Sequence, residues 1–205
     1  LTAALKIQGP RPNESRAAWV AQHHAAQKHY STPPERPTRR VSMERVMADL
    51  KAALPSDAIT ATDAGSFGQW PQRYLEFEHP DSYISPTLGC MGPGIPSAVA
   101  AKLAHPGRLV VAHIGDGGFL MTGQEMATAK QFGANIVAIV YNNEGYNSIR
   151  MHQEAQYPGR QYGTALVNPD FAALGTAYGA LGLKVSRDEE FLPALKKAMA
   201  ADRPA

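Results

Sequence analysis

The strongest constraint on the fold is the stretch of residues 109–143, because apolar runs alternate there with a glycine-rich turn. Residues 109–114 are nearly all apolar, as expected of a strand that is covered on both faces of a sheet. Residues 115–118 read Gly-Asp-Gly-Gly, residues 122–133 are polar and alanine-rich, and residues 136–140 form a second apolar run. The pattern predicts a strand, a tight turn, a helix and a second strand, which is the order of a parallel β-α-β unit.

The turn after the first strand carries a carboxylate among glycines. Gly115, Gly117 and Gly118 allow a sharp backbone turn and let an anionic group approach the main-chain amides without a side chain in between. Asp116 lies inside this turn, where its carboxylate would repel a phosphate unless a hard cation lay between the two groups. The turn therefore predicts an anion site that also holds a divalent metal.

The rest of the unit brings further oxygen ligands to the same place. Thr122 and Glu125 form a capping-box pair, which predicts the start of the helix, and Gly133 is placed to end it. The second strand then leads to Asn142 and Asn143. Because the carboxyl ends of parallel strands share one edge of a sheet, we expect both amides beside the carboxylate.

Two other glycine-containing turns are predicted at this edge. Residues 58–62 form an expected strand that leads into residues 63–68, where Gly65 and Ser66 can contact a phosphate through amides and a hydroxyl; an ordinary strand-to-helix turn is the alternative. Residues 85–96 are dense in glycine and proline, which predicts a defined turn. Their spacing does not match the Gly-x-Gly-x-x-Gly dinucleotide fingerprint.

Helices are expected over much of the remaining chain. They lie at residues 13–30, at residues 42–54 with Ser42 as the cap, at residues 171–180 and at residues 189–201. A further helix is expected to follow the turn at residues 85–96 and to end at residue 104. We also expect an exposed linker at residues 31–40, a mobile loop or lid at residues 153–167 and a short strand at residues 183–185.

Composition argues against several classes of function. The net charge of +2 is small and the one dense basic patch lies among prolines, so a nucleic-acid or membrane-surface role is not expected. The sequence contains no run of about twenty apolar residues, the length that a membrane-spanning helix requires. The single cysteine, Cys90, fits a reducing cytoplasm. The chain opens without methionine and closes at Ala205, where another strand is due, so we expect a fragment.

The Gly-Asp-Gly turn, followed after a β-α-β span by Asn-Asn, resembles the thiamine-diphosphate-binding motif. Over roughly residues 41–203 the chain is similar to the carboxy-terminal, diphosphate-binding domain of acetolactate-synthase-like enzymes. The resemblance implies an α/β fold of three layers, a parallel sheet with helices on both faces. It also implies that residues 1–40 are the tail of a preceding domain and a linker, and that residues 41–205 are the binding domain, truncated at its carboxy end.

The resemblance assigns roles at the sheet edge. It implies that Mg²⁺ is held by Asp116, Asn143 and the backbone carbonyl of Gly145. His152 is expected to face the substrate, or else to be a plain solvent-exposed histidine. The expected contacts with thiamine diphosphate come from the glycine turns, the loop that carries the methionine and the segment after Asn143: Gly65, Ser66, Phe67, Gly89, Met91, Gly115, Gly117, Gly118, Tyr146, Asn147, Ser148 and Ile149.

Three of these positions have specific implications. By resemblance, the carbonyl of Gly89 accepts a hydrogen bond from the aminopyrimidine of the cofactor. Met91 matches the bulky residue that wedges beneath the cofactor and keeps its two rings bent. Phe67 stands where many acetolactate synthases have a histidine, and this departure leaves the substrate more open than the cofactor.

The implied activity is that of an enzyme that binds thiamine diphosphate and Mg²⁺, decarboxylates a 2-oxo acid such as pyruvate and passes the product to an acceptor. In this family the activating glutamate comes from a pyrimidine-binding domain, usually of a neighbouring subunit. We therefore expect a homodimer or homotetramer in which this chain alone is inactive, since Glu125, Glu144 and Glu154 do not suit the role.

Other functions remain open on the same scaffold. They are a simple 2-oxo acid decarboxylase, a flavin-assisted oxidase that binds FAD through another domain, a non-catalytic cofactor-binding module and a generic nucleotide-binding α/β domain. Fold and cofactor do not determine the substrate.

Overall fold

A computed structural model describes residues 14–33 and 41–205 and divides the chain into two units, Leu1–Pro33 and Pro34–Ala205. In the first unit the described residues form helix α2 (Glu14–Tyr30), as the helical spacing predicts. The expectations for residues 1–13 and for most of the linker, residues 34–40, lie outside the described residues. All described strands belong to the second unit.

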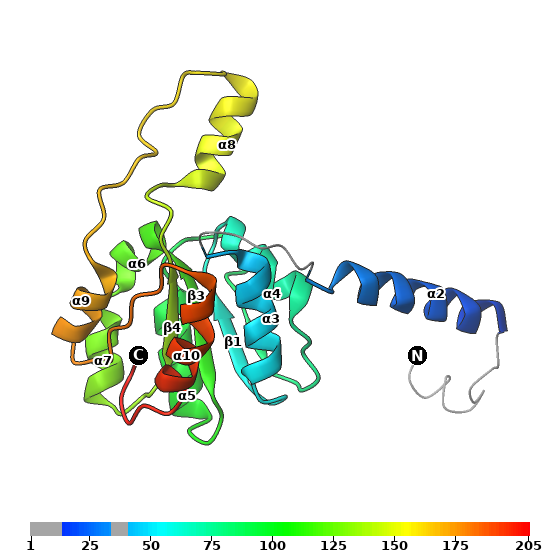
Figure 1. The fold of residues 1–205 in the computed structure, drawn as a ribbon, viewed down its shortest axis with the longest axis horizontal. Helices are drawn as coiled ribbons and strands as arrows, with labels where there is room; N and C mark the ends of the chain where they lie inside the picture. The colour runs from blue at the N-terminus through cyan, green and yellow to red at the C-terminus, as the bar shows by residue number, and fades with distance from the viewer. Residues whose placement is uncertain (1–13, 34–40) are drawn as a thin grey trace. The chain divides into compact units, whose positions relative to one another are not determined.

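Four parallel strands form one sheet in the order β2-β1-β3-β4 (Figure 1). The strands are β1 (Ile59–Thr62), β2 (Tyr83–Ile84), β3 (Val110–Gly115) and β4 (Val137–Tyr141). The chain leaves β1 toward β2 on one side of the sheet and returns to β3 on the other side. The carboxyl ends of β1 and β3 therefore form a topological switch point, which is where open α/β sheets bind ligands.

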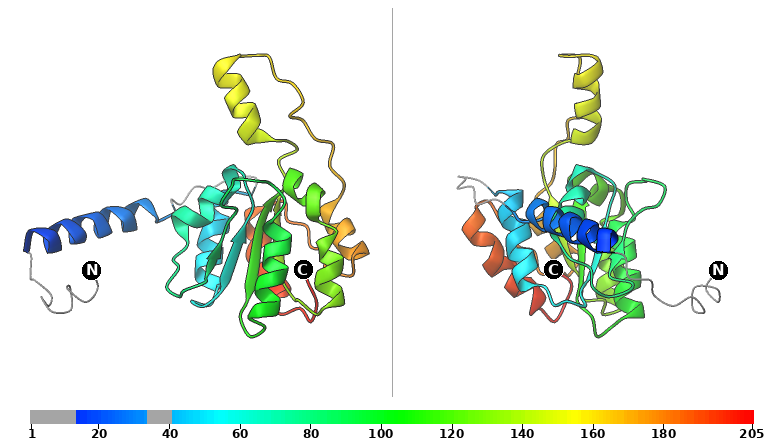
Figure 2. Two further views of the ribbon diagram at one scale, coloured as in Figure 1. Left: turned by 180° about the vertical axis from the view of Figure 1, so that it is seen from behind. Right: turned by 90° about the vertical axis from the view of Figure 1, so that its right-hand side faces the viewer.

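Helices cover both faces of the sheet, as the views in Figures 1 and 2 show. One face packs against α5 (Gly94–Ala104), α6 (Asp116–Thr122) and α7 (Glu125–Gln131), and the other against α3 (Met43–Ala53), α4 (Gln69–Tyr74) and α10 (Asp188–Met199). The remaining helices are the 3₁₀ turn η1 (Ser66–Gly68), α8 (Asn147–Gln156) and α9 (Phe171–Ala177). This is the predicted three-layer α/β arrangement.

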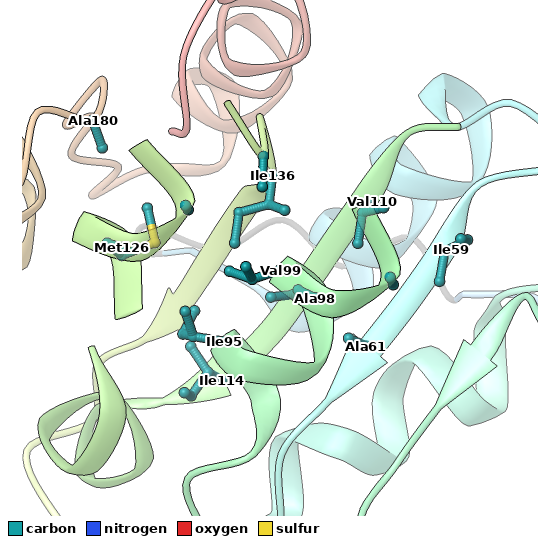
Figure 3. Close-up of a cluster of buried hydrophobic side chains, with 14 of the residues drawn as sticks. Ile59, Ala61, Ile95, Ala98, Val99, Val110, Ile114, Met126, Ile136 and Ala180 are labelled. Atoms are coloured by element: carbon teal, nitrogen blue, oxygen red, sulfur yellow. The ribbon is translucent and has the colours of Figure 1, made fainter. Parts of the chain in front are cut away.

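Alternate residues of each strand supply the two halves of the core. Ile114 on β3 points toward the α5 side together with Ile59, Ile95 and Ile136 (Figure 3). Val111 on the same strand packs with the residues of α3 and α10 on the other face. A parallel sheet that is buried on both sides needs such unbroken apolar runs, which explains why the strands could be predicted from the sequence.

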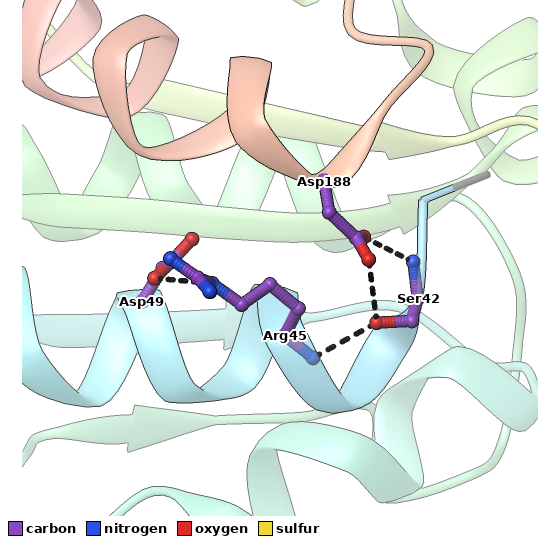
Figure 4. A network of polar contacts seen from close by, with 4 residues as sticks. All are labelled: Ser42, Arg45, Asp49 and Asp188. Carbon is purple, nitrogen blue, oxygen red and sulfur yellow. Dashed lines mark hydrogen bonds and ion pairs between the residues drawn. The ribbon is translucent and has the colours of Figure 1, made fainter. Parts of the chain in front are cut away.

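The predicted cap of α3 is confirmed, and it also joins two helices. Ser42 accepts a hydrogen bond through Oγ from the Arg45 amide at 3.3 Å, and its own amide donates to Asp188 Oδ1 at 2.6 Å (Figure 4). Arg45 in turn pairs with Asp49 at 3.0 Å. Because Asp188 begins α10, these contacts hold the starts of α3 and α10 together on one face of the sheet.

The predicted capping box is wrong. Helix α6 already begins at Asp116, directly after β3, so Thr122 ends this helix instead of starting one. The Thr122 hydroxyl donates to the carbonyl of Gly92, and α7 begins at Glu125 without a side-chain cap. Only the stop is as predicted, since α7 ends at Gln131 and Gly133 follows with φ of +65°.

The predicted strand at residues 183–185 is also wrong. Residue 205 lies beside β4: the Ala138 amide donates to the Ala205 carbonyl at 2.8 Å, and the Ala205 amide donates to the Ile136 carbonyl at 2.9 Å. The Leu181 amide donates to the Pro204 carbonyl at 2.7 Å. The terminus thus lies between β4 and the extended segment, and a cavity of about 800 Å³ lined by both continues from there.

The region predicted as a loop or lid contains a helix. Helix α8 runs to Gln156, buries no residue and projects away from the sheet in every view (Figures 1 and 2). The predicted helix at residues 171–180 is shorter, since α9 ends at Ala177. Among the described residues, no helix is both long and apolar enough to cross a membrane.

Candidate cofactor and metal site

The turns after β1, β3 and β4 meet at the carboxyl edge of the sheet. The amide of Asp63, the first residue after β1, donates to the His113 carbonyl of β3 at 3.0 Å. On β3 and β4, Gly115 is paired with Tyr141, so Asp116 and Asn142 follow at the same level. The topology alone therefore brings the three predicted turns together.

The glycines after β3 are required by close packing. A Cβ atom on Gly117 would lie 2.4 Å from the ring of Tyr146, and one on Gly118 would lie 2.4 Å from Asp63 Oδ2. A Cβ on Gly115 would lie 2.9 Å from the ring of Phe67. These distances are shorter than any carbon atom tolerates, so each glycine lets another turn of the site approach this one.

Asp116 is the buried carboxylate of this turn, with an exposed fraction of 3%. Its Oδ1 accepts a hydrogen bond from the Gly117 amide at 2.9 Å. Its Oδ2 accepts two, from the Gly145 amide at 3.2 Å and from Asn168 Nδ2 at 2.7 Å. A carboxylate oxygen has two lone pairs, so Oδ1 keeps one of them for a cation. The donor set thus fits a hard divalent ion such as Mg²⁺.

The turn after β4 has a different construction. Residues 142–144 are exposed, and Glu144 adopts φ of +58°, a left-handed conformation that is unfavourable for this residue type. A segment from far along the chain holds the turn in place. Gly145 forms an antiparallel bridge with Ala165, and the Leu166 amide donates to the Glu144 carbonyl at 3.0 Å.

The structure brings together two of the three predicted metal ligands. Asp116 and Gly145 are hydrogen-bonded, whereas the Gly145 carbonyl accepts from the Asn147 amide at 2.9 Å. Within the described residues no hydrogen bond joins Asn143 to Asp116. Asn143 is exposed and lines the large cavity, and it is Asn142 that connects to Asp116, through Asn168.

The turn after β1 contains a buried carboxylate that the sequence analysis did not single out. Asp63 is 3% exposed and accepts hydrogen bonds from the amides of Ala64 at 2.7 Å and of Gly92 at 2.8 Å. Burial raises the pKa of its carboxyl group, and these amide donors oppose the shift. Asp63 thus ties the loop of Met91 to the end of β1. Its position directly after an apolar strand was the available signal.

The predicted cofactor contacts near the loop of Met91 line two separate cavities. Gly65 and Gly89 line a hollow of about 160 Å³, together with Asp63. Ser66 and Phe67 line the large cavity. The Ser66 amide donates to Ser148 Oγ at 3.1 Å, which brings two predicted phosphate contacts together although they lie 82 positions apart in the sequence.

A buried polar pair, His113 and Tyr141, lies on the two strands that lead into the site. His113 on β3 is fully buried, and its Nδ1 lies 2.7 Å from the Tyr141 hydroxyl of β4. Burial lowers the pKa of His113 to about 3 and raises that of Tyr141 above its ordinary value. Phe67 stacks on Tyr141, with ring centroids 5.6 Å apart. This column connects the strands to the turn after β1.

Two predicted residues are not brought to the turns. Ile149 is half exposed on α8, and His152 is exposed on the same projecting helix. Their roles toward cofactor and substrate remain predictions. Asn168 is the site residue that sequence reasoning missed entirely, since it lies 52 positions from Asp116 in the sequence.

The donor and acceptor groups at this edge fit thiamine diphosphate and Mg²⁺ by their chemistry. A glycine turn at the start of a helix suits an anionic group, and the lone carboxylate within it suits a cation that neutralises both. No cluster of three or more histidine, cysteine, aspartate or glutamate residues that could hold a metal occurs in the described ranges. A transition-metal site of that type is thus not found there.

Known proteins are similar to this chain over most of its length. The family model described as thiamine pyrophosphate enzyme, C-terminal TPP binding domain, matches residues 63–205. The chain is 35% identical over 177 residues to the acetolactate synthase large subunit of Corynebacterium glutamicum, which covers 83% of this chain and 28% of that protein. It is 31% identical over 199 residues to the mitochondrial acetolactate synthase catalytic subunit of Saccharomyces cerevisiae, covering 94% and 29%.

A solved structure is similar as well. The thiamine diphosphate-dependent 4-hydroxybenzoylformate decarboxylase of Rhodococcus jostii RHA1 superposes with a TM-score of 0.77 at 31% identity, over 83% of this chain and 32% of that one. The chain thus spans about three tenths of the length of the relatives that it matches. Motif, fold and comparisons agree, and the chain belongs to the thiamine pyrophosphate enzymes, of which it carries the C-terminal TPP-binding domain.

Proposed function

We propose that the chain supplies the diphosphate- and Mg²⁺-binding half of the active site of an enzyme that acts on a 2-oxo acid, by decarboxylation and carboligation. The observation that carries the proposal is the buried Asp116 carboxylate within a glycine turn at the switch point of the sheet. The relatives in Corynebacterium glutamicum and Saccharomyces cerevisiae, both acetolactate synthases, support the reaction class.

In this proposal the residues of the three turns divide the work. Asp116, Asn143 and the Gly145 carbonyl would hold Mg²⁺, while the glycine turn, Ser66 and Ser148 would hold the diphosphate. The bound cofactor would supply the electron sink that decarboxylation of a 2-oxo acid requires. The chain itself binds, orients and neutralises charge.

Three glutamates of the described residues, Glu125, Glu144 and Glu154, do not suit the activation of the cofactor. Glu125 lies in the first turn of α7 and Glu144 in the turn after β4. Glu154 accepts hydrogen bonds from Gly159 and Gln161, within residues 147–163, which we call the arm because they project from the sheet and carry α8. We therefore infer that a pyrimidine-binding domain of a neighbouring subunit completes the site, in a homodimer or homotetramer. On its own the chain would bind cofactor but not turn over substrate.

A simple 2-oxo acid decarboxylase is the second candidate. The solved relative is named as a decarboxylase, and Phe67 presents an apolar ring where many acetolactate synthases have a histidine. The two reactions differ in their products, since the decarboxylase releases an aldehyde and the carboligase joins a second molecule of oxo acid. Product analysis of the holoenzyme with pyruvate and with an aromatic 2-oxo acid separates them.

Cofactor binding tests the proposal directly. We expect thiamine diphosphate with Mg²⁺ to change the fluorescence of Trp70, which lines the large cavity, as Phe67 does. Asp116→Ala should weaken metal-dependent binding by more than about 100-fold, because second-sphere changes alone cost metal sites about 10- to 100-fold. As a control, Asp57→Ala, in the exposed turn before β1, should bind as the wild type. Stabilisation by ATP with Mg²⁺, and none by thiamine diphosphate, would contradict the proposal.

A further inference from the structure

Asn168 reaches into the predicted metal site from the segment that precedes α9. Its Nδ2 donates to Asp116 Oδ2 at 2.7 Å and to Asn142 Oδ1 at 2.8 Å. One amide group therefore connects the turn after β3 with the turn after β4. We propose that Asn168 is a positioning residue that sets the orientation of the metal-binding carboxylate, an inference that rests on the proposed function of Asp116.

The two acceptors determine which way the Asn168 amide points. Both are oxygens without a hydrogen to give, a carboxylate on Asp116 and an amide carbonyl on Asn142, so the NH₂ group must face them. The reverse orientation would place Asn168 Oδ1 against the Asp116 carboxylate. Asn168 Oδ1 is sealed from solvent and has no partner among the described residues.

The backbone before Asn168 fixes its position. The Tyr146 amide donates to the Thr164 carbonyl at 2.9 Å, and Gly145 and Ala165 form an antiparallel bridge. We call residues 164–168 the brace, because they run along the turn after β4 and return to it from the arm that carries α8. The brace thus brings Asn168 within hydrogen-bond distance of Asp116.

The contacts have a consequence for metal binding. Asp116 Oδ2 is occupied by two N–H donors, of Gly145 and Asn168, whereas within the described residues Oδ1 accepts from Gly117 alone. The carboxylate is thus held with one oxygen turned to the brace and the other available to a cation. A ligand oriented in advance loses less freedom on binding, so removing Asn168 should weaken the metal site rather than abolish it.

The test measures Mn²⁺ affinity in the holoenzyme, by electron paramagnetic resonance in the presence of thiamine diphosphate. We expect Asn168→Ala to raise the Kd for Mn²⁺ by about 10- to 100-fold, the range found when outer-sphere partners of metal ligands are removed. Asn135→Ala, the same change in the segment that enters β4 at its other end, should leave the Kd unchanged. A Kd of Asn168→Ala within about twofold of the wild type overturns the inference.

A second variant separates positioning from mere stapling of the loop. Asn168→Asp puts a carboxylate beside Asp116, a repulsion that either a proton or a cation can relieve. At a pH at which both carboxyl groups are ionised, Mn²⁺ should therefore raise its Tm by more degrees than it raises that of the wild type. This variant also carries the test should Asn168→Ala not fold. If Mn²⁺ raises the Tm of both proteins by the same number of degrees, the inference is overturned. If the wild type itself binds neither Mn²⁺ nor thiamine diphosphate, it is the proposed function that fails.

Discussion

The turns after β3 and β4 lie side by side at the edge of the sheet, yet they are held in different ways. In the turn after β3, Asp116, Gly117 and Gly118 are buried at the start of α6. In the turn after β4, residues 142–144 are exposed, and the distant brace supplies the contacts. The first turn is thus made by residues adjacent in sequence, whereas the second depends on tertiary structure. We expect the two turns to respond differently to mutation.

The strands that lead into the two turns share one buried polar contact. The ring of His113 lies two positions before Gly115, and its hydrogen-bond partner Tyr141 directly precedes the turn after β4. The Nε2 atom of His113 has no partner among the described residues. Protonation of this ring would therefore place an uncompensated charge between the two turns.

Acid should disrupt this contact and loosen both turns together. The pKa of His113 is lowered from 6.5 to about 3 by burial, so the neutral ring contributes its full stabilisation above pH 6.5 and loses it as the pH falls toward 3. At about 1.4 kcal/mol for each pKa unit, the loss reaches roughly 5 kcal/mol. Urea unfolding at several values between pH 7 and pH 4 measures the slope of the free energy of unfolding against pH.

A variant provides the control for this titration. His113→Phe keeps a buried ring, so we expect it to be less stable than the wild type at pH 7 but to show a flatter dependence on pH. The exposed His105 serves as the matched position, where replacement by Phe should leave the slope as it is. An unchanged slope in His113→Phe would contradict the assignment of the acid sensitivity to this residue.

Gly118→Ala should break the buried turn. The new Cβ would lie 2.4 Å from Asp63 Oδ2 and 3.3 Å from the Ile114 side chain, so the carboxylate or the strand must move. Overpacking of this kind costs about 1–3 kcal/mol, which urea unfolding at pH 7 would detect. Gly107→Ala is the control, because nothing lies within 4 Å of its added Cβ. A Gly118→Ala protein as stable as the Gly107→Ala protein would show that the turn can yield.

Glu144→Gly probes the braced turn and should act in the opposite direction. A left-handed conformation costs a residue with a side chain about 1–2 kcal/mol, and replacement by glycine removes this cost. Glycine also gives the unfolded chain more conformational entropy, which offsets part of the gain, so a net stabilisation of about 0.5–1 kcal/mol is expected. Thermal unfolding would measure it. Asp81→Gly, at the other described non-glycine residue with positive φ, +56°, should gain less, because aspartate tolerates this conformation better. A destabilised Glu144→Gly protein would mean that the turn needs local stiffness besides the brace.

Much of the fold followed from local patterns. The apolar runs predicted β1, β3 and β4, and Ser42 marked the start of α3. The errors arose where tertiary structure competed with a local signal. The Thr122 hydroxyl was free to cap a helix but instead donates to Gly92. Residues 183–185 have strand-like composition, but the residue hydrogen-bonded beside β4 is Ala205.

The sequence by itself determined the parallel sheet, its carboxyl edge and the carboxylate within the glycine turn, because each depends on residues a few positions apart. Only the tertiary structure decided how that carboxylate is held. Asp63 meets the loop of Gly92 and Asn168 meets Asp116 across tens of residues of intervening chain. Such contacts leave no periodicity or spacing in the sequence, since they form only when separate elements have packed against the same edge of the sheet.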